Sequence, residues 1–225
     1  MNNYESNFWN LFGNSLSENP IDDNVMQMWS NRDYNLSRFY TTGFETIMFN
    51  KDQLFALETV LASTVAWDNE ILIAGNRNSI EKLCMVVDKQ NLTYSCLDWS
   101  SECWNEIDNY LSAYSGVTHL LVGIDSLTST ENIPVNKLLQ LASKNKLTLI
   151  VYCDIPVTGL NDIFNGAIDY MIGSSSVEPP ESFLVARRNK LVQTEGKSRS
   201  FNMDLYTYWQ WSMRDRTSII EPMKV

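Results

Sequence analysis

The sequence predicts an α/β domain of three layers, in which helices cover both faces of a mostly parallel sheet. Short apolar runs around Ile71, His119 and Leu149 are typical of buried strands, and amphipathic stretches alternate with them. This alternation favours parallel strands joined by crossover helices. With 225 residues, of which 44% are hydrophobic and 20% charged, the chain can bury one sizeable core, so a single domain is expected.

The chain begins with a polar stretch, residues 1–24, which contains an aromatic run from Phe8 to Phe12. We expect an N-terminal arm that docks through these rings, followed by one domain over residues 25–225. Residues 53–66 carry apolar side chains at three- and four-residue spacing and predict a helix. The remaining helices are expected at 79–89, 102–114 and 134–144, and the strands at 46–49, 70–74, 94–97, 118–122, 147–152, 167–175 and 182–187.

The formal net charge of -10 argues against a nucleic acid or an anionic membrane as partner, because both would be repelled. The densest basic clusters are short, one at 187–190 and one at 197–199. The four cysteines show no C-x-x-C spacing and the chain has one histidine, so a metal site is not expected. The N-terminus resembles no signal peptide and no apolar run could span a bilayer, which predicts a soluble cytoplasmic protein with free thiols.

Two motifs near the C-terminus carry a family resemblance. In the first, a strand at 147–152 is followed by a strand that ends in Ser174-Ser175 and by a return strand that ends in Ala186-Arg187. The second is the run from Gly196 to Trp209, with the pattern Gly-x-x-Arg-Ser-x-x-x-Asp-Leu-Tyr-x-x-Trp, which reads as a capped helix starting near residue 201. Both resemble class V, fold-type I pyridoxal-phosphate aminotransferases, and most closely those acting on 2-aminoethylphosphonate.

The resemblance covers residues 25 to 222 and implies the large domain of fold-type I pyridoxal-phosphate-dependent transferases. It also implies that the strand at 183–186 runs antiparallel to its neighbours. We expect the small C-terminal domain of the family, with the Arg that binds the substrate carboxylate, to be missing. The scaffold positions are kept, whereas the cofactor positions are changed.

Pyridoxal-phosphate catalysis requires a Lys for the aldimine and a carboxylate for the pyridine nitrogen. The resemblance places the family's carboxylate at Val151, its ring-stacking Tyr at Ser79 and its Lys within 174–180, where this chain has none. The family's phosphate turn falls on Lys51-Asp-Gln-Leu54, where two glycines are replaced and Asp52 adds a negative charge. We therefore expect that the cofactor is lost, and we assign no catalytic, cofactor-binding or metal-ligating residue.

His119 starts a strand, at the end of the sheet away from the expected site, and is interpreted as structural, because ligands of open α/β sheets bind beyond the carboxyl ends of the strands. Lys190 is the nearest Lys in sequence to the missing one, but the hairpin would have to refold to deliver it. A ligand pocket beyond the strand ends is the remaining candidate site, with these lining residues: Thr128, Asp154, Ser174, Ser175 and Arg199.

Three functions stay open. The leading hypothesis is a non-catalytic aminotransferase-like protein, a pseudoenzyme that serves as a binding or dimerisation module. The second is an enzyme with residual or altered activity on an aminophosphonate or amino acid. The third is an accessory subunit of an intact transaminase, which makes a homodimer or a heterodimer with a related transaminase the expected assembly. The aromatic face near Tyr206, Trp209 and Trp211 is the expected contact.

Overall fold

The computed structural model describes residues 43–49, 51–99, 104–125, 133–154, 167–174 and 182–220, of which 215–220 are described by their backbone alone. The chain divides into two units, Met1–Arg38 and Phe39–Val225, and all described residues belong to the second. The predicted N-terminal arm, residues 1–24, lies outside the described residues.

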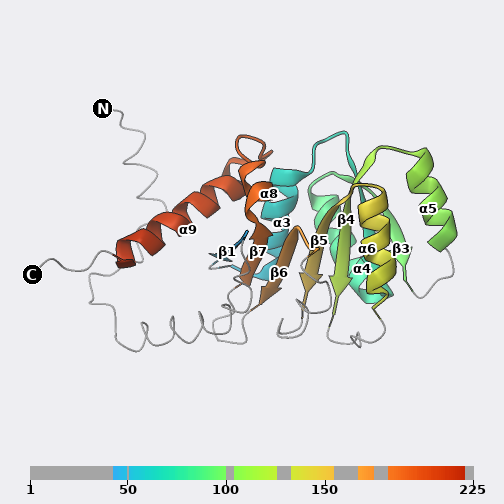
Figure 1. Cartoon of the computed structure of the whole chain (residues 1–225), viewed down its shortest axis with the longest axis horizontal. Helices are drawn as coiled ribbons and strands as arrows, with labels where there is room; N and C mark the ends of the chain where they lie inside the picture. Colours follow the sequence, from blue (N-terminus) through green and yellow to red (C-terminus); the bar gives the residue numbers. More distant parts are fainter. Residues whose placement is uncertain are drawn as a thin grey trace, which may run out of the picture. The chain divides into compact units, whose positions relative to one another are not determined.

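The described strands form one mixed sheet in the order β1-β7-β6-β5-β4-β2-β3 (Figure 1). The pairs β2–β3, β2–β4, β4–β5 and β5–β6 are parallel. β7 pairs antiparallel with both β6 and β1, as expected for the strand at 183–186. The strands are β1 (Phe44–Phe49), β2 (Glu70–Gly75), β3 (Thr93–Asp98), β4 (Val117–Ile124), β5 (Thr148–Cys153), β6 (Tyr170–Ser174) and β7 (Ser182–Arg187).

Helices cover both faces of this sheet, which confirms the predicted α/β class with three layers (Figure 1). Helices α3 (Gln53–Thr64) and α4 (Arg77–Lys89) pack side by side on one face, over β6 and β7 and over β2 and β3 respectively. Helices α5 (Trp104–Ala113) and α6 (Val135–Lys144) lie on the other face. This division follows from right-handed crossovers, because the chain moves one way from β2 to β3 and the opposite way from β3 to β4 and β5.

The close packing of α4 on the sheet depends on two glycines. A Cβ atom added at Gly123 in β4 would lie 2.7 Å from Leu83 Cδ1 and 2.9 Å from Ser79 Cβ. At Gly75, the end of β2, an added Cβ would lie 3.1 Å from the same Ser79 Cβ. The glycines thus let the first turns of α4 approach the strand ends, and they bury Ser79 between helix and sheet.

The C-terminal motif forms two short elements and a long helix. α8 (Arg188–Val192), which the sequence did not predict, and the 3-10 turn η3 (Phe201–Met203) precede α9 (Leu205–Ile220). The helix expected near residue 201 therefore begins four residues later, because Asp204 caps it: one carboxylate oxygen accepts the amide proton of Tyr206 at 3.1 Å and of Thr207 at 3.5 Å.

α9 packs against α3, α8 and β1. Trp209, expected at an intermolecular contact, is only 5% exposed and belongs to the core that α3, α4 and α9 form over the sheet. Its indole therefore contributes to the fold of a single chain. In the described part of the chain, no helix has the length and apolar composition needed to cross a membrane.

Candidate functional site

Polar side chains gather at the carboxyl edge of the parallel strands, the edge where ligands of open α/β sheets bind. We refer to them as the carboxyl-edge cluster, which consists of Gln53, Asn76, Lys82, Asp125, Tyr152 and Asp154. They come from the start of α3, the start of α4 and the ends of β2, β4 and β5. From β2 the chain moves to β3 on one side and then crosses back to β4 on the other side of β2, so the topological switch point lies between β2 and β4. Asn76 follows β2, and Asp125 follows β4.

Asn76 joins the ends of β2 and β4. Its side-chain oxygen accepts the amide proton of Ser79 at 2.9 Å and so caps α4, while its amide nitrogen donates to both carboxylate oxygens of Asp125 at 3.0 Å. One residue therefore fixes the helix start and the orientation of a neighbouring carboxylate.

Lys82 and Asp154 form the charged centre of the cluster. The lysine Nζ lies 2.8 Å from each carboxylate oxygen, and the two side chains are 39% and 27% exposed. The same Nζ lies 5.0 Å from the centre of the Tyr152 ring, a cation–π distance. Burial, and then the negative charge of Asp154, raise the pKa of Tyr152 well above its usual value, so the phenol keeps its proton.

Gln53 ties the start of α3 to the end of β5. Its amide nitrogen donates to the carbonyl oxygen of Cys153 at 2.9 Å, and its amide oxygen accepts the Tyr152 hydroxyl at 3.1 Å. The preceding residue, Asp52, caps α3 by accepting the amide proton of Phe55 at 2.9 Å. The buried Ser182 hydroxyl contacts the carbonyl oxygens of Lys51 and Asp52 and anchors this turn to β7.

The structure places the predicted pocket residues in different regions. Asp154 belongs to the carboxyl-edge cluster, and Ser174 ends β6 at the same edge, where it is in register with Ser182 of β7. Thr128 and Ser175 lie outside the described residues.

Arg199 lies at the opposite, amino edge of the sheet, away from Asp154. Its guanidinium donates to the carbonyl oxygen of Leu61 at 3.2 Å and to the side chain of Gln90 at 2.8 Å, and it stacks on Trp67 at 4.5 Å. This differs from the expected place in a cleft beyond the strand ends. The physical reason is that Arg199 satisfies the last carbonyls of α3 and the residue that ends α4.

The positions that the resemblance assigns to the cofactor have other roles here. Val151 is fully buried in β5 and supplies no carboxylate, and Ser79 is buried between α4 and the sheet. Lys190, the nearest Lys in sequence to the missing one, donates to the Thr148 hydroxyl at 3.2 Å. Because Thr148 begins β5 and Ser174 ends β6, Lys190 lies at the wrong edge of the sheet for a Schiff base.

Sequence reasoning did not assign Gln53, Asn76, Lys82 or Asp125 to the site. A usable signal existed for two of them, because Asn76 and Asp125 are the first polar residues after the buried runs of β2 and β4. Lys82 and Gln53 carry no such signal, since their partners are 72 and about 100 residues away in the chain.

Comparison with known proteins finds distant relatives and a shared fold. No family model matches the chain. A 2-aminoethylphosphonate–pyruvate transaminase of Bacteroides fragilis is 23% identical over 201 residues, which covers 82% of this chain and 55% of the relative. The 2-aminoethylphosphonate–pyruvate transaminase of Salmonella paratyphi B is 26% identical over 176 residues, which covers 75% of this chain and 48% of the relative. The chain thus spans about half the length of the curated relatives it matches.

Solved structures agree on the fold. Ureidoglycine–glyoxylate aminotransferase from Bacillus subtilis superimposes with a TM-score of 0.59 at 14% identity, covering 88% of this chain and 54% of the other. Alanine–glyoxylate aminotransferase from Nostoc sp. superimposes with a TM-score of 0.57 at 15% identity, covering 84% and 54%.

Proposed function

Since this chain is a distant relative of 2-aminoethylphosphonate–pyruvate transaminases and has the fold of pyridoxal-phosphate aminotransferases, we propose that it is a non-catalytic aminotransferase-like protein. In this role the large-domain scaffold serves as a binding or dimerisation module in the cytoplasm, linked to phosphonate or amino-acid metabolism. The chain acts without pyridoxal phosphate.

The N-terminus of α3 is the observation that carries this proposal. The resemblance places the cofactor phosphate there, where backbone N–H groups of a glycine-rich turn would hold it. Here the Asp52 carboxylate accepts the Phe55 amide proton at 2.9 Å and places a negative charge at the helix end. A phosphate dianion would have to displace this cap and would be repelled by it.

The other cofactor positions support the same proposal. The carboxyl-edge cluster contains one lysine, Lys82. Its Nζ lies 2.8 Å from both carboxylate oxygens of Asp154. Aldimine formation needs an amine that is free to attack the cofactor aldehyde, whereas this amine is held in an ion pair with Asp154. Val151 offers no carboxylate for a pyridine nitrogen. These residues do not fit pyridoxal phosphate, and we derive no reaction step through it.

The test is reconstitution of the full-length chain with excess pyridoxal phosphate, followed by dialysis, borohydride reduction and mass mapping. We expect no stoichiometric yellow adduct and no specifically modified lysine. Lys82→Arg is the informative variant, with exposed Lys137→Arg as its matched control. A single reduced adduct at Lys82 that is lost in Lys82→Arg and kept in Lys137→Arg would replace the non-catalytic proposal with an enzymatic one.

An altered enzyme is the second candidate, and the carboxyl-edge cluster is the observation that favours it. Asn76, Asp125, Lys82 and Asp154 place amide, carboxylate and ammonium groups at the topological switch point. Calorimetric titration with 2-aminoethylphosphonate separates the candidates. Saturable binding that Asp154→Asn weakens, together with turnover of an amino donor, would favour the enzyme.

An accessory role in an intact transaminase differs from both by its partner. Recovery of a full-length transaminase with the tagged chain, in a defined stoichiometry and with a change in its activity, would indicate this role. Self-association of the chain, without recovery of a transaminase, would instead support an independent module.

A further inference from the structure

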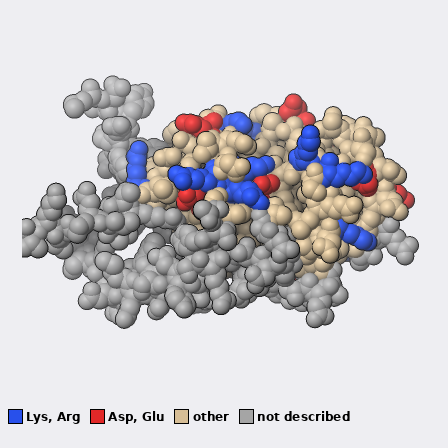
Figure 2. Space-filling model, viewed as in Figure 1, with Lys and Arg blue, Asp and Glu red and all other residues tan. Residues whose placement is uncertain are grey.

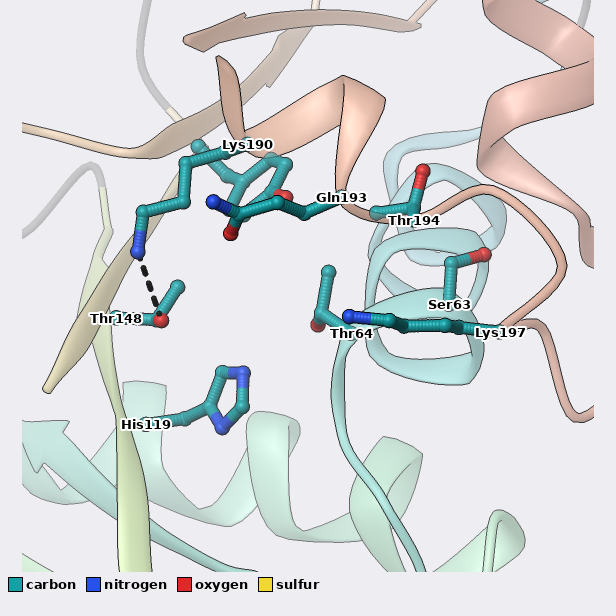
Figure 3. A pocket seen from close by; sticks show the side chains of 9 residues that line it. Ser63, Thr64, His119, Thr148, Lys190, Gln193, Thr194 and Lys197 are labelled. Atoms are coloured by element: carbon teal, nitrogen blue, oxygen red, sulfur yellow. Dashed lines mark hydrogen bonds between the residues drawn. The ribbon is translucent and has the colours of Figure 1, made fainter.

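A cavity of about 100 Å3 lies at the amino edge of the sheet, opposite to the carboxyl-edge cluster. It is bordered by the end of α3, the first residues of strands β4, β5 and β6, and the segment from α8 towards η3 (Figure 3). We call it the amino-edge pocket. Its lining consists of Ser63, Thr64, His119, Thr148, Tyr170, Lys190, Gln193, Thr194 and Lys197.

Some of the lining hydroxyls are already used by the fold. Ser63 donates to the carbonyl oxygen of Met203, Thr64 to that of Val60, and Thr194 to that of Leu191, at 2.7 to 3.0 Å. A hydroxyl has a single proton to donate, so these three have no donor left for a ligand.

The remaining polar groups can donate into the pocket. Lys190 donates to the Thr148 oxygen at 3.2 Å, which leaves the Thr148 proton and further Lys190 protons available. Figure 3 shows that the ends of Lys190, Gln193 and Lys197 point towards the same space. No ion pair or hydrogen bond of the Lys197 ammonium is seen within the described residues. The pocket is therefore rich in donors.

The charge around the pocket is positive although the chain carries a net charge of -10. The segment 187–199 contains five Lys and Arg residues and a single carboxylate, Glu195. Lys and Arg gather on the displayed face over α8 (Figure 2). Asp169 lies 3.6 Å from Lys190 and 3.5 Å from Arg187, so it compensates part of this charge, but among the described residues no carboxylate lines the pocket.

His119 forms the floor of the pocket and is 4% exposed. Its Nδ1 lies 2.7 Å from the Thr118 hydroxyl oxygen, and the other edge of the ring faces the cavity (Figure 3). When the Thr118 hydroxyl donates to Nδ1, the neutral ring carries its proton on Nε2 and donates into the pocket. Burial, and then the charge of Lys190, lower the pKa of His119 to about 4.

We propose that the amino-edge pocket binds a small oxyanion of the phosphate type, held by Lys190, Lys197, Gln193, Thr148 and His119. An ionised tetrahedral oxyanion presents mainly acceptors, which matches a lining that has donors and, among the described residues, no carboxylate. A cavity of about 100 Å3 has room for an inorganic phosphate, whereas a larger organic group would have to extend out of the open side of the pocket. This site is separate from the carboxyl edge and is independent of the proposed function.

The single histidine of the chain is the reporter for the test. The His119 ring signals are followed by NMR from pH 7 to pH 4 with and without inorganic phosphate, at constant ionic strength set by sodium chloride. A bound anion favours the imidazolium, so we expect the pKa of His119 to rise by about one unit or more. A rise of the same size in the pKa of His119 with sodium chloride alone would overturn the proposal. An unchanged pKa in the presence of phosphate would also overturn it.

Two exposed lysines at opposite edges give matched variants. Lys197→Gln removes a donor of the pocket, whereas Lys51→Gln removes the lysine beside the N-terminus of α3, the other conceivable phosphate site. We expect Lys197→Gln to raise the dissociation constant for phosphate about tenfold and Lys51→Gln to leave it unchanged. Weaker binding in Lys51→Gln with unchanged binding in Lys197→Gln would overturn the proposal.

Glycerol 3-phosphate, tested in the same titration, distinguishes two sources of the anion. Tighter binding than that of inorganic phosphate would indicate a phosphate monoester whose organic part extends out of the pocket. Weaker binding would indicate the free anion. Failure of both to bind contradicts the site.

Discussion

The buried imidazole of His119 makes stability depend on pH at the scale of a single residue. Its pKa is about 4 in the folded chain against 6.5 for an ordinary histidine, so below pH 6.5 the unfolded chain binds more protons. The contribution of His119 to the free energy of unfolding does not change above pH 6.5. It falls progressively as the pH drops from 6.5 to about 4, and it is constant below pH 4. The total loss is about 3 kcal/mol.

We predict that this loss is absent in His119→Asn, which removes the titrating ring and keeps a polar side chain beside Thr118. Unfolding by urea is measured at pH 7 and at pH 4 in a phosphate-free buffer. Carboxylates also titrate in this range, but their effect is shared by both proteins and cancels in the comparison. Equal changes in the free energy of unfolding for the two proteins would contradict a buried, neutral His119.

At the scale of an element, the start of α9 depends on its cap. Asp204 accepts the amide protons of Tyr206 and Thr207, and its second oxygen accepts the Thr207 hydroxyl at 2.8 Å. We predict that Asp204→Ala lowers the free energy of unfolding by about 1 kcal/mol, measured from denaturant midpoints. The control is Glu195→Ala, which removes an exposed carboxylate from a nearby turn. A loss of equal size in both variants would show that charge, and not capping, matters.

At the scale of the whole molecule, we predict self-association through the region around η3 and the first turn of α9. Phe201 in η3 is 83% exposed, and Tyr206 in the first turn of α9 is half-buried. Large aromatic side chains in this position favour a protein contact. Sedimentation velocity should show a concentration-dependent dimer that Phe201→Ser weakens roughly tenfold.

Met85→Ser is the matched control for this prediction, because Met85 is an apolar side chain on α4 that is 66% exposed. It should leave the dimer unchanged. A monomer at all concentrations, with no effect of Phe201→Ser, would mean that this surface faces solvent in the isolated protein.

The sequence by itself determined the fold class and the place of most elements. The runs that became β2, β4 and β5 are short, apolar and bounded by polar residues, and burial in a sheet is the structure that such runs adopt. Their ends were predicted to within one or two residues. α8 was missed because five residues are too few for a periodic pattern, and α9 was placed too early because its cap lies after a 3-10 turn.

Only the tertiary structure decided the sites. Lys82 meets Asp154 across 72 residues, and Lys190 meets Thr148 across 42, through strand order and crossovers that no local pattern encodes. Arg199 belongs to a motif that the sequence made conspicuous, yet its partners are the ends of α3 and α4. Hydrophobic periodicity depends on neighbours within a few residues, whereas the partner of a polar side chain depends on which distant backbone passes beside it.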